Sequence, residues 1–220
     1  MAHEFQIEES DTIEQEDFEN YENDEGISST IASTDIIIIA GKRGSGKSNA
    51  TLVYIEFLLS QGCPIAIADP LLEFQEYRNR GCIVENLPYG DITAFDKWLD
   101  ALKSQKFEGM VIIDEADGFF PNRKDLSPIR KSLIHIGRHW GMGIIAVTRR
   151  LSNLHTDLVS QANKLLIFRL FSGADLEYLK RANFDNDVIN CVANLDKYWF
   201  LFIDDNEDNY VEHQPLQLLK

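Results

Sequence analysis

The residues from Gly41 to Ser48 have the types and the spacing of a loop that binds phosphate. They read Gly-Lys-Arg-Gly-Ser-Gly-Lys-Ser and match the pattern G-x-x-x-x-G-K-[ST]. Glycines let the backbone curl around an anion with no Cβ in the way, so that successive N–H groups point at phosphate oxygens. The pattern places Lys47 on the β- and γ-phosphates of a nucleotide and the Ser48 hydroxyl on Mg²⁺. The predicted nucleotide-binding residues are Gly41, Lys42, Arg43, Gly44, Ser45, Gly46, Lys47, Ser48 and Asn49.

Two adjacent carboxylates follow a second apolar run. Met110–Ile113 is typical of a buried parallel strand, and it ends in Asp114 and Glu115. After a phosphate-binding loop this is the Walker B position, where Asp114 holds the Mg²⁺ shell and Glu115 is the general base for the attacking water. Asp69 also follows a short apolar strand, and its carboxylate suits a cap of the next segment as well as a place facing the nucleotide. The residues therefore predict hydrolysis of ATP with Mg²⁺, in which Lys47 and Glu115 are catalytic.

The elements around these groups alternate between strands and helices. Four isoleucines (Ile36–Ile39) precede the loop, and a helical pattern follows it until Gly62. Apolar runs predict further strands at Pro64–Ala68, Cys82–Val84, Gly143–Val147, Lys164–Leu170 and Tyr198–Ile203. Helical patterns follow the predicted N-caps Asp91 and Ser127 and cover Asp157–Ala162 and Ala174–Ala182. The alternation predicts an α/β fold with a mostly parallel sheet and helices on both faces.

The predicted helix after Ser127 has an apolar face and a basic face. The apolar face is expected to consist of Ile129, Leu133, Ile136 and Trp140. The opposite face carries Lys131, His135 and Arg138. A basic face exposed to water is as good an interpretation of these three residues as a functional one.

The net charge is concentrated at the N-terminus. The chain of 220 residues has a formal charge of -15, and residues 1–25 carry eleven of its 36 acids with no lysine or arginine. The remaining 25 acids are nearly balanced by 21 bases, so the charge does not exclude a nucleic-acid partner. We predict an acidic, disordered tail at residues 1–30 and one P-loop ATPase domain at residues 31–220. The tail is either plain solvated sequence or a segment that competes with DNA for basic groups.

Composition also limits the type of protein. Cys63, Cys82 and Cys191 are widely spaced and form no C-x-x-C pattern, so they indicate neither a disulfide framework nor a zinc site. No apolar run approaches the length of about 18 residues that a membrane span needs, and the acidic N-terminus is the reverse of a signal peptide. We therefore expect a soluble protein of a reducing compartment.

The order of these motifs resembles the FtsK/HerA superfamily of DNA-pumping ATPases. Besides the loop and the acidic strand, the segment Gly-Arg-His-Trp-Gly-Met-Gly-Ile-Ile-Ala-Val-Thr-Arg-Arg at 137–150 is similar to that superfamily, and the short form resembles genome-packaging ATPases of icosahedral viruses with an internal membrane. The resemblance covers roughly residues 34–205 and implies a P-loop NTPase of the additional-strand, catalytic-glutamate type. One position departs from the pattern, because Arg149 stands where the family usually has a glutamine that senses the γ-phosphate. Arg149 either contacts the γ-phosphate itself or points away from it.

The resemblance also implies partners and further functional residues. Members of the superfamily form homo-oligomeric rings in which a neighbour supplies an arginine to the ATP site, and Arg138 is the first candidate here and Arg130 the second. Pore loops grip double-stranded DNA through its phosphates, for which Arg123 and Lys124 are the best-placed pair. A capsid or vertex protein of the internal membrane is a further implied partner, and the implied location is the host cytoplasm or the virion.

Two other functions remain open from the sequence. The first is a cellular HerA-like translocase that processes DNA, although full-length proteins of that type carry an N-terminal barrel where this chain has an acidic tail. The second is a nucleotide-dependent switch or a small-molecule kinase with the same loop. Glu115 beside Asp114 favours attack by water over transfer to a substrate.

Overall fold

An eight-stranded sheet forms the centre of the part of the chain that the structure describes. The computed structural model describes residues 31–170, 172–204 and 210–216, so the predicted acidic tail lies outside the described residues. The sheet order is β3-β2-β4-β5-β1-β6-β7-β8. The strands are β1 (Ile36–Ala40), β2 (Ile65–Ala68), β3 (Ile83–Glu85), β4 (Gly109–Ile113), β5 (Met142–Thr148), β6 (Lys164–Phe168), β7 (Phe200–Asp204) and β8 (Tyr210–His213). The helices are α1 (Lys47–Ser60), α2 (Ile92–Ser104), α3 (Pro128–Ile136), α4 (Thr156–Ser160), α5 (Gly173–Arg181) and α6 (Asn186–Asn194).

The first six strands run parallel, and the last two add an antiparallel edge. In the centre, Ile38 of β1 lies opposite Ala146 of β5 and Leu165 of β6. Strand β7 is antiparallel to β6, and β8 is antiparallel to β7. Unbroken apolar sequences form the central strands because both faces of such a sheet are covered. The predicted α/β fold with a mostly parallel sheet is confirmed.

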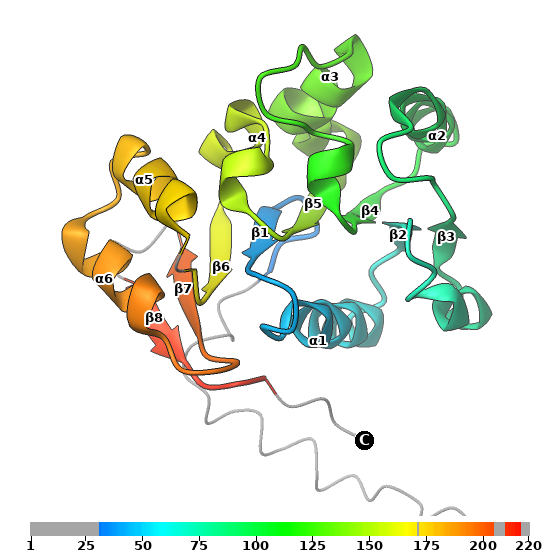
Figure 1. Cartoon of the computed structure of the whole chain (residues 1–220). Coiled ribbons are helices and arrows are strands. Elements are labelled where there is room, and N and C mark those ends of the chain that lie inside the picture. Colours follow the sequence, from blue (N-terminus) through cyan, green and yellow to red (C-terminus); the bar gives the residue numbers. More distant parts are fainter. Residues whose placement is uncertain (1–30, 171, 205–209, 217–220) are drawn as a thin grey trace, which may run out of the picture. The chain divides into compact units, whose positions relative to one another are not determined.

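Helices cover both faces of the sheet, as predicted. Figure 1 shows α1 on one face and α2, α3 and α4 on the other. On the α1 face, Tyr54, Ile55 and Leu58 are buried. On the other face, alternate residues of β1 join a core that includes Phe95 of α2 and Leu133 of α3. A parallel sheet with this arrangement brings its functional groups together at the carboxyl ends of the strands.

Two predicted helix starts are confirmed at atomic detail. The Asp91 carboxylate accepts a hydrogen bond from the Ala94 N–H at the start of α2. The Ser127 hydroxyl accepts one from the Arg130 N–H at the start of α3, with Pro128 at the first helical position. Both caps satisfy backbone donors that have no partner within the helix.

The predicted apolar face of α3 is partly wrong. Leu133 is buried, but Ile136 is 43% exposed and Ile134 is buried instead. The helix ends at Ile136 and continues as the 3₁₀ turn η4 (Gly137–Trp140), so the α-helical period does not extend to Trp140.

The sequence did not predict two further elements, α6 and β8. In the described ranges, no helix combines the length and the apolar character that crossing a membrane requires.

Candidate nucleotide-binding and catalytic site

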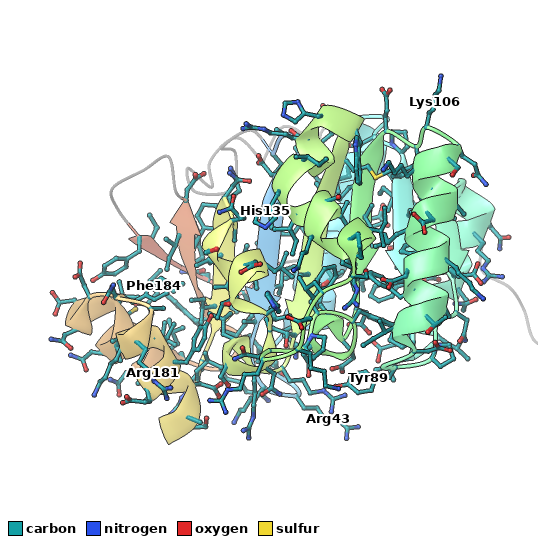
Figure 2. All side chains as sticks on the ribbon, turned by 90° about the horizontal axis from the view of Figure 1, so that it is seen from above. Arg43, Tyr89, Lys106, His135, Arg181 and Phe184 are labelled. Atoms are coloured by element: carbon teal, nitrogen blue, oxygen red, sulfur yellow. The ribbon has the colours of Figure 1, made fainter. Side chains whose placement is uncertain are left out.

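The predicted phosphate-binding loop connects β1 to α1 at the carboxyl edge of the sheet. Gly44 and Gly46 have φ angles of 75° and 110°, a region that favours glycine, and Gly46 is the N-cap of α1. A Cβ on Gly41 would lie 2.6 Å from the Phe168 Cβ and 2.7 Å from the Ser45 Oγ. The loop is thus a close-packed backbone turn at a helix N-terminus, which is the geometry that binds phosphate. Arg43 extends to this edge of the molecule, opposite the edge of Lys106 (Figure 2).

Lys47 lies at the start of α1 and reaches back across the loop. Its Nζ donates to the Lys42 carbonyl oxygen at 3.2 Å. Burial lowers the pKa of the Lys47 ammonium, and the charges of Glu115 and Asp114 raise it in part. A cation that has lost part of its hydration gains more from a phosphate than an exposed lysine would.

Oxygen ligands for a hard cation lie beside the loop. The Ser48 hydroxyl is 3.4 Å from Glu73 Oε2, and Asp114 follows the end of β4. Burial, and after it the charge of Glu115, raise the pKa of the Asp114 carboxyl to about 7. A buried carboxylate with acidic neighbours is stabilised by a divalent cation, and hydroxyl and carboxylate oxygens fit Mg²⁺. Ser48 and Asp114 therefore fit the predicted magnesium site.

Asp69 holds the segment that carries Glu73. Its carboxylate is fully buried and accepts hydrogen bonds from the N–H groups of Glu73 and Phe74 at 2.9 and 3.0 Å, and from Gln75 Nε2 at 2.6 Å. Of the two interpretations left open by the sequence, the structure supports the cap. Sequence reasoning missed Glu73, because no motif connects it with Ser48.

Glu115 and Arg149 form an ion pair at the predicted catalytic position. Arg149 Nε and Nη2 lie 2.8 and 2.5 Å from Glu115 Oε1. Glu115 has a left-handed backbone, with φ 47° and ψ 47°, which is uncommon for this residue type. The Glu115 side chain is 13% exposed, whereas that of Arg149 is 51% exposed. Arg149 therefore does not point away from the site, and its partner in this structure is the predicted general base.

A second group of polar residues continues along the same edge. Asp117 Oδ2 accepts from the Tyr89 hydroxyl at 3.1 Å, and Oδ1 lies 3.2 Å from the Thr148 hydroxyl. Tyr89 and Asp117 line a pocket of about 490 Å³ that Arg123 and Arg181 also line. Figure 2 shows Tyr89 and Arg181 toward the same edge as the loop. Asp117 thus connects the end of β5 with a pocket that two arginines line.

The candidate DNA-contact residues follow β4 in an exposed loop. Arg123 and Lys124 are both exposed, and Arg123 has a left-handed backbone with φ 63°. Arg123 also lines the pocket of about 490 Å³. A pore in which Arg123 and Lys124 contact DNA would be formed by several copies of the chain.

The two candidates for the trans arginine differ in exposure. Arg138 is exposed on η4, which precedes β5 and lies at the edge of the sheet opposite the phosphate loop. Arg130 is only 3% exposed, and within its own chain it pairs with Asp96 Oδ1 at 2.8 Å and donates to the Phe119 carbonyl at 2.7 Å. Arg130 therefore cannot reach a neighbouring subunit without leaving a buried ion pair, and this second candidate is wrong.

The fold is shared with several solved structures. The genome-packaging NTPase B204 of Sulfolobus turreted icosahedral virus 2, solved in complex with ATP-gammaS, superimposes with a TM-score of 0.77 at 24% sequence identity. The match covers 85% of this chain and 100% of B204. The conjugation coupling protein TcpA of pCW3 matches with a TM-score of 0.60 at 16% identity, over 83% of this chain and 60% of TcpA. These matches confirm the predicted P-loop NTPase fold.

Sequence similarity supports the predicted superfamily. The DNA double-strand break repair helicase HerA of Pyrococcus furiosus is 32% identical over 92 residues, which is 40% of this chain and 17% of HerA. The chain thus spans less than a fifth of the length of this relative.

A family model matches a longer part of the sequence. The model described as "Zonular occludens toxin (Zot)" matches residues 35–171, more than half of the chain and including the phosphate loop, Asp114, Glu115 and Arg149. The chain therefore belongs to the Zot family.

Proposed function

We propose that this protein is an ATP-hydrolysing double-stranded DNA translocase that packages a viral genome. The observation that carries the proposal is the convergence of Lys47, Ser48, Asp114 and Glu115 on one edge of the sheet. The match over the whole length of a viral packaging NTPase supports packaging as the purpose. The similarity to HerA favours a DNA-processing translocase as the second candidate.

Different residues of the chain have different roles in ATP hydrolysis. Lys47 and the loop N–H groups would hold the β- and γ-phosphates, and Ser48 and Asp114 would hold the cation. When bound, Mg²⁺ would neutralise charge that develops on the phosphate oxygens. Glu115 orients the attacking water and accepts its proton.

Arg149 couples ATP binding to the availability of Glu115 as the general base. Arg149 pairs with Glu115 Oε1 through Nε and Nη2, so it occupies the oxygen that would accept a hydrogen bond from the attacking water. We propose that Arg149 moves to the γ-phosphate when ATP binds, since its side chain is half exposed and its planar fork matches phosphate oxygens. Glu115 is then free to contact water while ATP is bound.

Assembly into a homo-oligomeric ring is part of the proposal. Arg138 lies at the edge opposite its own phosphate loop, so it reaches a nucleotide only in a neighbouring subunit. Head-to-tail contacts between different surfaces close into rings. Arg123 and Lys124 would contact DNA phosphates in the pore, and the motor would act in the host cytoplasm or the virion, docked to a capsid or vertex protein of the internal membrane.

Phosphate release measured with and without duplex DNA tests the proposed function. A translocase hydrolyses ATP slowly alone, and duplexes of unrelated sequence should stimulate it equally because phosphate contacts carry no base information. Replacing Arg123 and Lys124 by alanine should weaken duplex binding to all sequences alike and make it less dependent on salt. Transfer of phosphate to a small acceptor without DNA stimulation would instead identify a kinase.

A further inference from the structure

The pocket of about 490 Å³ lies at the carboxyl edge of the sheet but is separate from the nucleotide site. Its walls come from the loops that follow β4 and β5, from α5 after β6, and from the segment before α2. Lys47, Ser48, Asp114 and Glu115 are not among its lining residues. Most of the lining side chains are polar or charged, whereas pockets for small organic ligands are mostly apolar. This composition indicates a charged ligand of another kind.

Hydrogen bonds fasten three of these segments to one another. The Asn122 N–H donates to the Asn153 carbonyl oxygen at 2.7 Å, and Asn122 Nδ2 donates to the Ser152 carbonyl oxygen at 2.8 Å. These bonds join the loop after β4 to the 3₁₀ turn η5 (Leu151–Asn153). The Ser152 hydroxyl donates to Asp175 Oδ1 at 2.9 Å, and Asp175 is buried in the first turn of α5. The loop after β4 and α5 are therefore held at a fixed separation.

Two of the connected segments each contribute an arginine to the pocket. Arg123 belongs to the loop after β4, and its backbone is left-handed with φ 63°. A residue other than glycine persists in that region where the surrounding structure fixes it, and such residues cluster at functional sites. On α5, Ala174, Tyr178 and Arg181 recur at the spacing of one helical face, and all three line the pocket. The fold thus directs one face of α5 toward the loop that carries Arg123.

The partner of Arg181 in this structure can be exchanged for a phosphate. Arg181 Nε lies 3.5 Å from Glu177 Oε1, one turn earlier on α5, and the two side chains are 66% and 55% exposed. An exposed ion pair of this kind contributes little to stability. A phosphate offers the same charge-assisted contact, and the guanidinium fork can bind two of its oxygens at once. The lining acid, Asp117, already contacts the hydroxyls of Tyr89 and Thr148.

We propose that this pocket binds one phosphate group of the DNA backbone between Arg123 and Arg181. The inference rests on the proposed translocase function, and it assigns to α5 a contact with DNA that no motif in the sequence indicates. Arginine, tyrosine and asparagine side chains contact DNA phosphates, and such contacts position a duplex without reading its sequence. The lining residue Tyr89 is 58% exposed, and Figure 2 shows Tyr89 and Arg181 toward the edge that carries Arg43. A duplex bound here would lie beside the ends of β4 and β5, which carry the predicted catalytic groups.

Fluorescence anisotropy of a labelled duplex, titrated with the full chain at several salt concentrations, tests this contact. Arg181→Ala should weaken duplex binding about 5- to 10-fold at about 0.1 M salt and lower the slope of log affinity against log salt by about one, because one phosphate contact is lost. Arg181→Lys should keep the salt slope, because it keeps the charge and loses only the planar fork. Lys180→Ala, which removes an exposed cation of the same helix outside the pocket, is the matched control and should not change duplex affinity.

Glu177→Gln should have an effect of the opposite sign. The amide no longer forms an ion pair with Arg181, so duplex binding should become several-fold tighter at low salt. Glu108→Gln, which removes an exposed acid just before β4 at the opposite edge of the sheet, is the matched control and should not change duplex affinity. Unchanged or weaker binding by Glu177→Gln overturns the assignment of Arg181.

A double variant tests whether the two arginines hold the same phosphate. Arg123→Ala combined with Arg181→Ala should lose less duplex affinity than the product of the two single losses, because either change already breaks the shared contact. Single losses that multiply in the double variant would show two separate contacts and overturn the shared site.

Two further results would overturn the inference and leave the proposed function intact. One is unchanged duplex affinity in Arg181→Ala. The other is calorimetric binding of inorganic phosphate that Arg181→Ala loses while it keeps its duplex affinity, since the pocket would then hold a free anion. The thermal unfolding midpoint checks that each variant folds. If the wild-type protein neither binds duplex DNA nor hydrolyses ATP, the proposed function itself fails.

Discussion

The two sides of the phosphate loop differ in chemistry. On the β4–β5 side, Asp114, Glu115 and Arg149 lie within one charged network, and Asp114 has a raised pKa. On the β6–β7 side, Phe168 and Tyr198 border an apolar pocket closed by the C-terminal segment. One side thus carries charged groups next to the phosphate loop, and the other offers an aromatic and aliphatic surface. Changes on the first side should affect turnover, and at Arg149 also the affinity for a nucleotide with a γ-phosphate.

Lys47→Ala should have the largest effect, because Lys47 is expected to contact the phosphates, on which both affinity and turnover depend. We expect no detectable hydrolysis and loss of affinity for ATP and tripolyphosphate alike, since the variant removes the cation placed on the β- and γ-phosphates. Phosphate release and calorimetry measure the two effects. Hydrolysis near the wild-type rate would refute the assignment of the site.

Glu115→Gln should separate turnover from affinity. The amide keeps the shape of the side chain and loses its basicity, and a general base contributes about 10²–10⁴-fold, so hydrolysis should stall by that factor while ATP still binds. Single-turnover hydrolysis and ATP titration test this. Asp117→Asn, two residues further along the same edge, is the control for loss of an acid at this edge. Equal loss of binding and turnover would indicate that Glu115 is a structural carboxylate.

Arg138→Ala should lower turnover by about 10³-fold without preventing ATP binding, if Arg138 acts on a neighbour's γ-phosphate. Lys131→Ala, which removes another exposed cation of the same region, is the control and should have little effect. Mixing Arg138→Ala with Glu115→Gln subunits should restore part of the activity, because some interfaces then join an intact Glu115 to an intact arginine. No recovery in demonstrated mixed assemblies would contradict the trans role.

Arg149→Gln should have a smaller effect that depends on the γ-phosphate. ATP affinity should fall about tenfold, as expected for a lost hydrogen bond to a charged group, whereas ADP affinity should not change. Competition titrations with the two nucleotides measure the difference, and Arg150→Gln is the adjacent control. An equal fall in ADP affinity would show that Arg149 contacts another part of the nucleotide.

The remaining prediction concerns stability, not turnover or affinity. The pKa of Asp114 is about 7 in the folded chain and about 3.9 in an unfolded one, so the folded state binds the proton more tightly. The free energy of unfolding should therefore fall as pH rises from about 4 to about 7, by about 1.4 kcal/mol for each pH unit, and Asp114→Asn should lack this part of the slope. Urea unfolding of the wild type and of Asp114→Asn without Mg²⁺, at several pH values, tests whether the free energy of unfolding falls as pH rises. Parallel pH profiles would contradict the raised pKa.

The sequence predicts the charged side of the site much better than the apolar side. The loop from Gly41 to Ser48 and the pair Asp114–Glu115 follow directly from short, local patterns whose chemistry requires those residue types. Glu73 reaches Ser48 only because Asp69 caps the intervening segment, and Leu216 reaches Asn49 from 167 residues away. Such contacts depend on tertiary packing and leave no periodic signal in the chain.

Tertiary packing also explains which parts of the fold the sequence did not predict. Continuous apolar runs identified the central strands, because burial on both faces demands them. The exposed residues of β8 (Tyr210–His213) show no such run, and the change from α-helix to η4 after Ile136 moved the apolar face that the period of 3.6 residues predicts. Arg149 could be identified as a departure from the family pattern, but its pairing with Glu115 required the structure.

Displacement of a triplex-forming strand from linear duplex DNA tests the central claim most directly. A translocase moving along the duplex strips the third strand in the presence of ATP and Mg²⁺, and the rate should not depend on the duplex sequence. We predict displacement by the wild-type protein and none by Lys47→Ala or Glu115→Gln, although Glu115→Gln still binds ATP. Hydrolysis that is stimulated by DNA yet never displaces the third strand would contradict translocation.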